Sequence, residues 1–381
     1  MDSNSSDFKT PGQLIEALLN ERGWSKRTLA VVVGVDEATV NRWISDKQPI
    51  NANIALLLEE VLSTPAERFL ELQRAYDLAK ARFAKRPDPD RANRAQLFGT
   101  LPITTMIKRG WLRADDIRDV ANIEKELVRF FGAESANQIE VLPHAAKKTV
   151  VEGDTSPTQL AWLYRVRSIA EDLMVAPYSE AKLRDSLPAL RNLAIAPEEA
   201  RRVPRIMAEA GVRFVIVESL PSAKIDGVCF WLNAGAPVIG MSLRHDRIDN
   251  FWFVLRHEIE HVLQGHGKSA IILDAELEGE RAGTGETVSD EERVANQAAA
   301  DFLVPASKMD AFIERKAPFF SERDLLGFAK TLGVHAGVIA GQLQHKTGRY
   351  DRFRQHLAGI RQTVISGAAV DGWGNPYPLE D

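Results

Sequence analysis

The sequence predicts a mainly α-helical protein with a small β-sheet, an α+β fold that begins with an all-α domain. Apolar residues recur at helical spacing over most of residues 8–211. Between residues 212 and 243 this spacing gives way to short β-branched runs bounded by glycine, proline and asparagine. Helical spacing returns at Phe251. A chain of 381 residues is long enough for two or three domains with cores of their own.

Short helices are expected over residues 8–83. Pro11–Arg22 is amphipathic, and a second helix ends at Gly34. Asp36 is placed to cap a third helix over Glu37–Ile44. Two short helices around a glycine-containing turn are typical of a helix-turn-helix, and a plain helical bundle is the alternative. The side chains expected to point inward are Leu29, Ala30, Val35, Val40 and Ile44.

The helix over Glu37–Ile44 carries residue types that suit DNA recognition. Asn41 and Arg42 can make bidentate hydrogen bonds to adenine and guanine in the major groove. Charges nearly cancel over the first hundred residues, which argues against DNA binding. A homodimer can still align two weakly basic patches on the DNA, and we expect one. The candidate DNA-binding residues are Thr39, Asn41 and Arg42 for the bases, with Ser25, Lys26 and Lys47 for the phosphates.

Residues 11–82 contain PGQLIEALLNERGWSKRTLAVVVGV and end in FLELQRAYDLAKAR. This stretch resembles a HigA-type antitoxin of the Cro/repressor class. The resemblance implies that the chain binds operator DNA as a homodimer and that a toxin is a protein partner. Residues 1–83 are therefore expected to be a HigA-like helix-turn-helix DNA-binding domain.

A linker and a helical middle region are expected over residues 84–195. The charged stretch AKRPDPDRANR, which starts at Ala84, is interrupted by two prolines and is typical of a linker or turn. No residue of this region predicts a chemical role, so we expect it to join the two functional ends. The helical patterns that follow cover residues 117–131, 157–174, Glu180–Leu193 and 197–211.

Three short runs, over residues 212–220, 227–232 and 237–243, predict β-strands. Cys229 lies in the second run and is expected to be a buried strand residue. Because the chain has one cysteine, it cannot form an intramolecular disulfide, which favours a reducing compartment.

The helical run that follows contains an H-E-x-x-H motif from His257 to His261. These two histidines lie one turn apart on one helix face, where both imidazoles can bind one Zn²⁺. Glu258 lies a quarter-turn round, close enough to act as a general base beside the metal. The motif alone is also compatible with a chance match on a surface helix, so a third ligand is needed.

A second helix over residues 288–304 offers that ligand, with Ser289 as a candidate N-cap and Pro305 just past its end. Glu292 begins one face of this helix and Glu291 begins a neighbouring face. Helical spacing alone leaves both carboxylates open as ligands.

H-E-x-x-H followed by E-x-x-A-N-x-x-A-A-x-x-L-x-P resembles the ImmA/IrrE family of metallopeptidases, over residues 196–362. The resemblance implies a zincin-like fold in which an edge strand aligns an extended substrate. It selects Glu292 as the third zinc ligand, with Glu258 catalytic. Glu260 departs from the usual Gly and Ala298 from the usual Phe. The matching residues are His257, Glu258, His261, Glu292, Ala295, Asn296, Ala299, Ala300, Leu303 and Pro305.

Other features near the two helices have competing interpretations. The acidic, glycine-rich stretch over residues 273–292 is a solvated loop or a lid that attracts a basic substrate segment. His266 is expected to end the first helix rather than to bind metal. For His335 and His345 we expect structural roles, with stabilisation of an oxyanion as the alternative.

The composition points to a cytoplasmic protein without a membrane partner. The N-terminal MDSNSSDFKT is polar, unlike a signal peptide, and no apolar run approaches the roughly 18 residues that span a bilayer. The net charge of −5 is too small to indicate a partner.

The patterns together predict a DNA-binding, antitoxin-like transcriptional regulator with a zinc-dependent endopeptidase domain over residues 196–365 and an irregular tail over residues 366–381. The resemblance to the ImmA/IrrE family implies a repressor or antitoxin protein as the substrate. The alternative is a non-catalytic antitoxin or repressor that binds operator DNA and a HigB/RelE-like toxin, with the metal fold as a sensor or scaffold.

Overall fold

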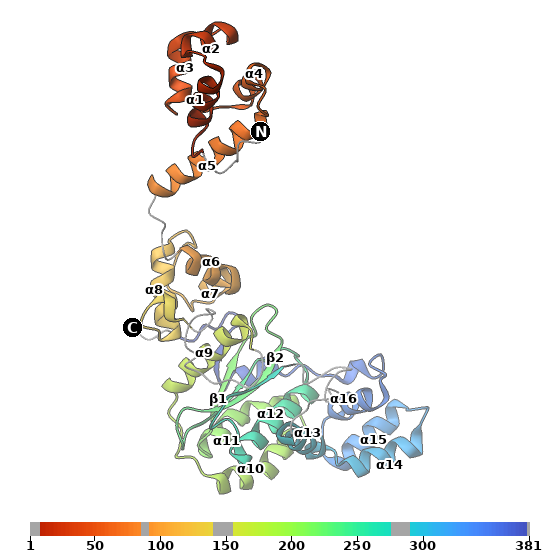
Figure 1. Ribbon diagram of the computed structural model, residues 1–381. Helices are drawn as coiled ribbons and strands as arrows, with labels where there is room; N and C mark the ends of the chain where they lie inside the picture. Colours follow the sequence, from red (N-terminus) through yellow and green to blue (C-terminus); the bar gives the residue numbers. More distant parts are fainter. Residues whose placement is uncertain (1–7, 85–90, 140–154, 276–289, 379–381) are drawn as a thin grey trace. The chain divides into compact units, whose positions relative to one another are not determined.

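The computed structural model describes residues 8–84, 91–139, 155–275 and 290–378 (Figure 1). The chain forms two compact units, Met1–Pro89 and Asp90–Asp381. Helices dominate both, and the strands of the described ranges form one small sheet, so the expected α+β class is confirmed. Ser289 and most of the acidic stretch fall outside the described residues.

Local signals set the helix ends of the first unit. The Ser25 hydroxyl accepts a hydrogen bond from the backbone amide of Thr28 at 3.0 Å and caps α2. The Asp36 carboxylate likewise caps α3, and Gly34 ends α2 with a φ of 74°. The helices are α1 (Pro11–Arg22), α2 (Lys26–Val33), α3 (Glu37–Ile44), α4 (Ala52–Leu62) and α5 (Ala66–Ala84).

These helices pack around one apolar core. The sequence correctly predicts that Leu29, Ala30 and Val40 are buried. Val35 and Ile44 are only half-buried, and Trp43 of α3 takes the inward place instead. The core is completed by Leu14, Ile15, Leu19, Ile50, Ala55, Leu58, Leu62, Ala66 and Phe69.

The second unit contains a five-stranded sheet in the order β4-β2-β3-β1-β5. Strands β3 and β5 run parallel to β1, whereas β2 pairs antiparallel with both β3 and β4. The sequence predicts β1, β2 and β3, but not the two edge strands. The bounds are β1 (Arg213–Val217), β2 (Ile225–Trp231), β3 (Pro237–Met241), β4 (Ile272–Ala275) and β5 (Ala369–Asp371).

Apolar cores cover both faces of this sheet. Along β1, Phe214 and Ile216 join one core while Val215 and Val217 join the other, as alternation along a strand requires. The first core holds α10 (Glu180–Leu193), α11 (Val203–Glu209) and α12 (Ile248–Gln264). The second holds α6 (Arg91–Thr100), α7 (Ile103–Lys108), α8 (Val120–Phe131) and α9 (Pro157–Asp172).

The helices expected as a separate middle region therefore pack directly on the sheet. The Trp162 indole of α9 donates a hydrogen bond to the Val217 carbonyl of β1 at 2.9 Å. On the opposite face, Leu183 and Leu190 of α10 are fully buried. Helices α9 and α10 therefore belong to the same unit as the sheet, although the sequence predicts a domain boundary at residue 195.

Residues 369–371 form β5, whereas the sequence predicts an irregular tail there. Asp371 is fully buried and accepts hydrogen bonds from Trp111 Nε1 at 2.9 Å and Arg165 Nε at 2.8 Å. Because Arg165 is itself buried, it needs a paired carboxylate, and this pairing fixes the tail to the sheet.

The remaining helices follow β4 along the chain. They are α13 (Asp290–Leu303), α14 (Ala306–Lys316), α15 (Glu322–Leu332), α16 (Ala336–Thr347) and α17 (Arg361–Ile365), together with three short 3₁₀ turns elsewhere in the described ranges. One of these turns, Pro197–Arg202, and α11 replace the single helix expected over residues 197–211. None of the helices in the described ranges combines the length and hydropathy of a bilayer-crossing segment.

Candidate metal centre and nucleic-acid interface

Helix α12 is enclosed on nearly all sides. His257, Glu258 and His261 are fully buried, between the sheet and α13. On α13, Ala295 and Ala299 are buried, and their small side chains let the two helices lie close together. This packing brings the start of α13 next to the two histidines.

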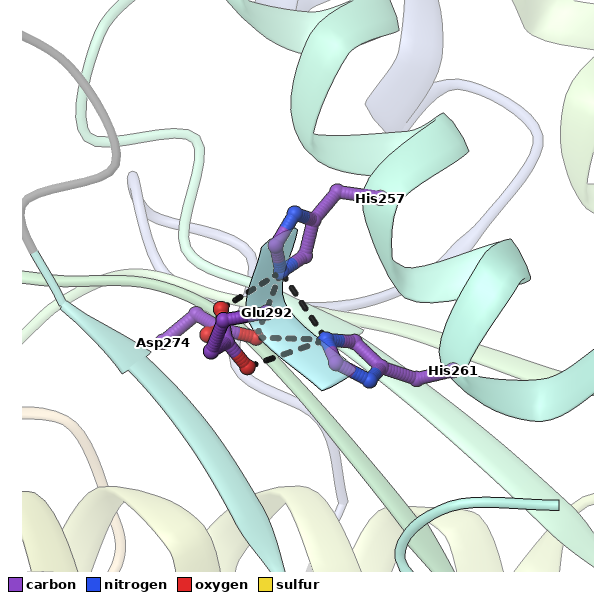
Figure 2. A group of neighbouring side chains, drawn as sticks. All are labelled: His257, His261, Asp274 and Glu292. Atoms are coloured by element: carbon purple, nitrogen blue, oxygen red, sulfur yellow. Dashed lines mark hydrogen bonds and ion pairs between the residues drawn. The ribbon is translucent and has the colours of Figure 1, made fainter. Parts of the chain in front are cut away.

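The two histidines face one another across one helix turn, with their Nε2 atoms 3.0 Å apart (Figure 2). Glu292 completes a triangle with them. Its Oε1 lies 3.2 Å from His261 Nε2, and its Oε2 lies 3.4 Å from His257 Nε2. Glu291, which spacing left open, lies instead with Oε1 3.7 Å from His266 Nε2. The structure thus brings together the three residues that the sequence predicts as metal ligands.

A fourth side chain, Asp274 of β4, belongs to the same cluster. Its Oδ2 lies 3.4 Å from His257 Nε2 and 4.0 Å from His261 Nε2. The sequence predicts that Asp274 lies in the acidic loop, so Asp274 is not among the predicted ligands. The apolar run from Ile271 to Leu273 directly before it was the signal for a strand that ends at the site.

The donor set and its spacing fit a zinc ion. Imidazole nitrogens and carboxylate oxygens are ordinary zinc ligands, and bonds of about 2.0–2.2 Å separate the donor atoms of a tetrahedral site by about 3.3–3.6 Å. Most of the separations above lie close to this range. Among the described residues, the buried Asp274 Oδ2 has no hydrogen-bond partner, which is costly unless a cation is bound.

Glu258 projects from α12 toward β2. A Cβ atom at position 227 would lie 1.9 Å from Glu258 Oε1, so Gly227 provides the room for this carboxyl group. Burial raises the pKa of Glu258 well above its usual value, and the negative charges of Asp274, Glu292 and Asp226 raise it further. Both effects favour the protonated form of this carboxyl group in the metal-free protein.

For His257 and Glu292, the pKa is set mainly by neighbouring groups of opposite charge. Burial lowers the pKa of His257, but Asp274 and Glu292 outweigh that effect and raise it to about 9. Burial raises the pKa of Glu292, but its hydrogen bonds to His257 and His261 hold it well below its usual value. The site is therefore built to stabilise positive charge between its carboxylates.

Residues around the cluster hold its parts in place. His266 lies just beyond the end of α12, as expected, and its Nδ1 is 3.0 Å from His261 Nδ1, the ring nitrogen that faces away from the cluster. A partner on that nitrogen orients a metal-binding imidazole. Glu260 faces elsewhere: it accepts hydrogen bonds from Arg256 Nη2 at 2.7 Å and Gln264 Nε2 at 2.6 Å.

The later histidines lie elsewhere in the fold. His335 caps α16 by accepting a hydrogen bond from the amide of Gly337 at 3.1 Å. His345 is exposed near the end of α16. The capping hydrogen bond is consistent with the structural role expected for His335, and the role expected for His345 stays a prediction.

The candidate DNA-binding residues lie on or beside α2 and α3. Asn41, Arg42 and Lys47 are exposed, and Arg42 Nη2 donates a hydrogen bond to Thr39 Oγ1 at 2.7 Å. The Ser25 hydroxyl is engaged in capping α2, so its use as a phosphate ligand would compete with the cap. Lys26 Nζ lies 4.0 Å from Glu16 Oε1.

Comparison with known proteins gives one match in each of the two compact units. Residues 15–69 match the helix-turn-helix family, and residues 208–347 match peptidase family M78, described as the IrrE N-terminal-like domain. A solved structure titled "Pseudomonas aeruginosa antitoxin HigA with higBA promoter" is 32% identical over 20% of this chain and 83% of that chain, with a TM-score of 0.19. No curated protein matches the chain. The chain thus joins a region that matches the helix-turn-helix family to a region that matches peptidase family M78 on one polypeptide.

Proposed function

We propose that this protein is a DNA-binding transcriptional regulator whose second unit is a zinc-dependent endopeptidase that cleaves a repressor or antitoxin protein. The observation that carries the proposal is the convergence of His257, His261 and Glu292, with Glu258 beside them, in a domain of a peptidase family. A helix-turn-helix on the same chain supports the link to gene regulation.

In this proposal His257, His261 and Glu292 hold Zn²⁺, which supplies Lewis acidity to the reaction. Glu258 accepts the proton of the attacking water at its carboxylate and later delivers that proton to the leaving amine nitrogen. Its burial against Gly227 fixes the carboxyl group in one orientation. The low exposure of the cluster keeps bulk water from competing with the substrate.

The DNA-binding part of the proposal rests on the exposed residues of α3. Thr39, Asn41 and Arg42 would contact bases, while Lys26 and Lys47 would contact phosphates. Ser25 would contribute chiefly as the N-cap that fixes the start of α2. A homodimer would double the small positive charge of this surface. The operator of the gene itself is the DNA we expect it to bind.

One observation favours a second candidate function, a non-catalytic antitoxin that neutralises a toxin. Asp274 offers a fourth protein ligand, and zinc sites with four protein ligands are structural rather than catalytic. Under this alternative the metal domain is a sensor or scaffold, and Glu258 has no role in the cell.

The deciding experiment incubates the zinc-loaded protein with repressors and antitoxins encoded beside its gene and follows cleavage by mass spectrometry. The first proposal predicts fragments with the wild type and none with Glu258→Gln. Glu260→Gln is the matched control, because Glu260 is a buried carboxylate of the same helix that pairs with Arg256. Equal amounts of intact partner with wild type and Glu258→Gln would favour the antitoxin alternative.

A further inference from the structure

Asp274 approaches the histidine pair from the side on which a metal would bind. Its Oδ2 lies 3.4 Å from Nε2 of His257, and Nε2 is also the atom that faces His261 and Glu292. Carboxylates that only orient a metal-binding histidine contact its other ring nitrogen. For His261 that nitrogen is already taken by His266. Asp274 is therefore placed as a ligand and not as an orienting partner.

We propose that Asp274 is the fourth protein ligand of the metal in the resting protein, so that the centre is closed to external ligands until Asp274 withdraws. This inference rests on the metal binding proposed above. Structural zinc sites have four protein ligands, whereas catalytic sites have three and leave one position open. A peptidase with this centre is latent until its substrate binds, and its activation requires that binding to move Asp274.

The position of Asp274 in the sheet provides a place for that change. Asp274 lies opposite Gly227, and the pairing of β2 with β4 shifts register between Ile225 and Gly227. Irregularities of this kind re-aim a side chain and weaken the local ladder. Among the described strands, β4 lies at the edge of the sheet and pairs with β2 alone. A segment that binds along β4 would therefore act directly on the residue that closes the centre.

The test uses the full-length protein with Co²⁺ in place of zinc, because the visible absorption of Co²⁺ reports its ligands. Azide is the probe for an open position. We expect azide to leave the wild-type spectrum unchanged and to shift that of Asp274→Asn, in which a nearly isosteric amide replaces the carboxylate. Zinc affinity, measured by chelator competition, should fall by about 10- to 100-fold or more in this variant, since losing outer-shell partners alone has an effect of that size.

Asp290→Asn is the matched control, because Asp290 is an exposed carboxylate at the start of α13 that pairs with Arg293. It should behave as wild type in both measurements. An azide-dependent shift in wild-type spectra, or unchanged zinc affinity in Asp274→Asn, would overturn the inference. The wild-type azide titration decides the question even if Asp274→Asn does not fold.

The same measurements separate this inference from the proposed function. Cleavage by a wild-type protein whose cobalt spectrum responds to azide would overturn the fourth ligand and leave the peptidase standing. A wild-type protein that binds neither zinc nor cobalt would overturn both. An azide-insensitive wild type and an azide-sensitive Asp274→Asn would support the inference whether or not a substrate is cleaved.

Discussion

Helices α12 and α3 place their functional residues in opposite environments. His257, Glu258 and His261 of α12 are fully buried, whereas Asn41 and Arg42 of α3 are exposed. Buried polar groups are stable only when they have partners, so the residues of α12 depend on one another. Exposed residues carry no such dependence. The comparison teaches that substitutions in α3 should act on one ligand contact at a time, whereas those in α12 act on a coupled group.

The largest effect is expected for Glu258→Gln, which tests whether α12 and α3 act independently. Glu258→Gln should lower the rate of partner cleavage by about 10²–10⁴-fold, because an amide cannot accept the proton of the attacking water. Zinc content and operator binding should be those of the wild type, since Glu258 is not a proposed ligand and lies in the other unit from α3. Elemental analysis and DNA titration check these two controls. Loss of zinc from this variant would show that Glu258 holds the metal.

The next effect concerns base recognition by α3. Arg42→Ala should weaken binding to the operator by about 1–3 kcal/mol, the range expected for a lost base contact, with a smaller effect on random DNA. Arg74→Ala, which removes an exposed arginine of α5, is the matched control. Titration of the wild type with operator and random DNA comes first. Equal affinity for both would indicate that the helix-turn-helix binds protein instead.

A smaller effect is expected at the cap of α2. Ser25→Ala should lower the free energy of unfolding by about 1 kcal/mol, because it removes the hydroxyl that accepts the Thr28 amide. Urea unfolding measures this change. A loss of operator affinity without a loss of stability would show instead that Ser25 binds phosphate directly.

The smallest effect is expected at a single phosphate contact. Lys47→Ala should reduce the slope of log affinity against log salt concentration by about 1, equally for operator and random DNA. Lys80→Ala in α5 removes a lysine that lies over the Tyr76 ring, and it should leave the slope unchanged. If both variants keep the wild-type slope, Lys47 does not contact DNA.

The sequence predicts best those helices whose ends carry local signals. The bounds of α1, α3 and α10 are predicted to the residue, because Thr10, Asp36 and Ser179 cap their first turns. The H-E-x-x-H spacing also places His257 and His261 correctly, since helix geometry alone determines their separation.

Features made by distant segments could not be predicted in this way. Strands β4 and β5 have four and three residues, too few for a pattern, and they form only because β2 and β1 lie beside them. Asp274 enters the metal cluster through that pairing. The choice between Glu291 and Glu292 likewise depended on resemblance at the sequence level, because both residues begin inward-facing rows of α13. How α13 packs on α12 decides between them.

Zinc content after equilibration with a competing chelator tests the central claim most directly, in the wild type, Glu292→Ala and Glu291→Ala. The wild type should retain about one zinc per chain. Glu292→Ala should lose most of it, because Glu292 faces both histidine rings with its two oxygens. Glu291→Ala, the adjacent carboxylate beside His266, should stay close to the wild type. Undiminished zinc in Glu292→Ala would contradict the proposed centre of His257, His261 and Glu292.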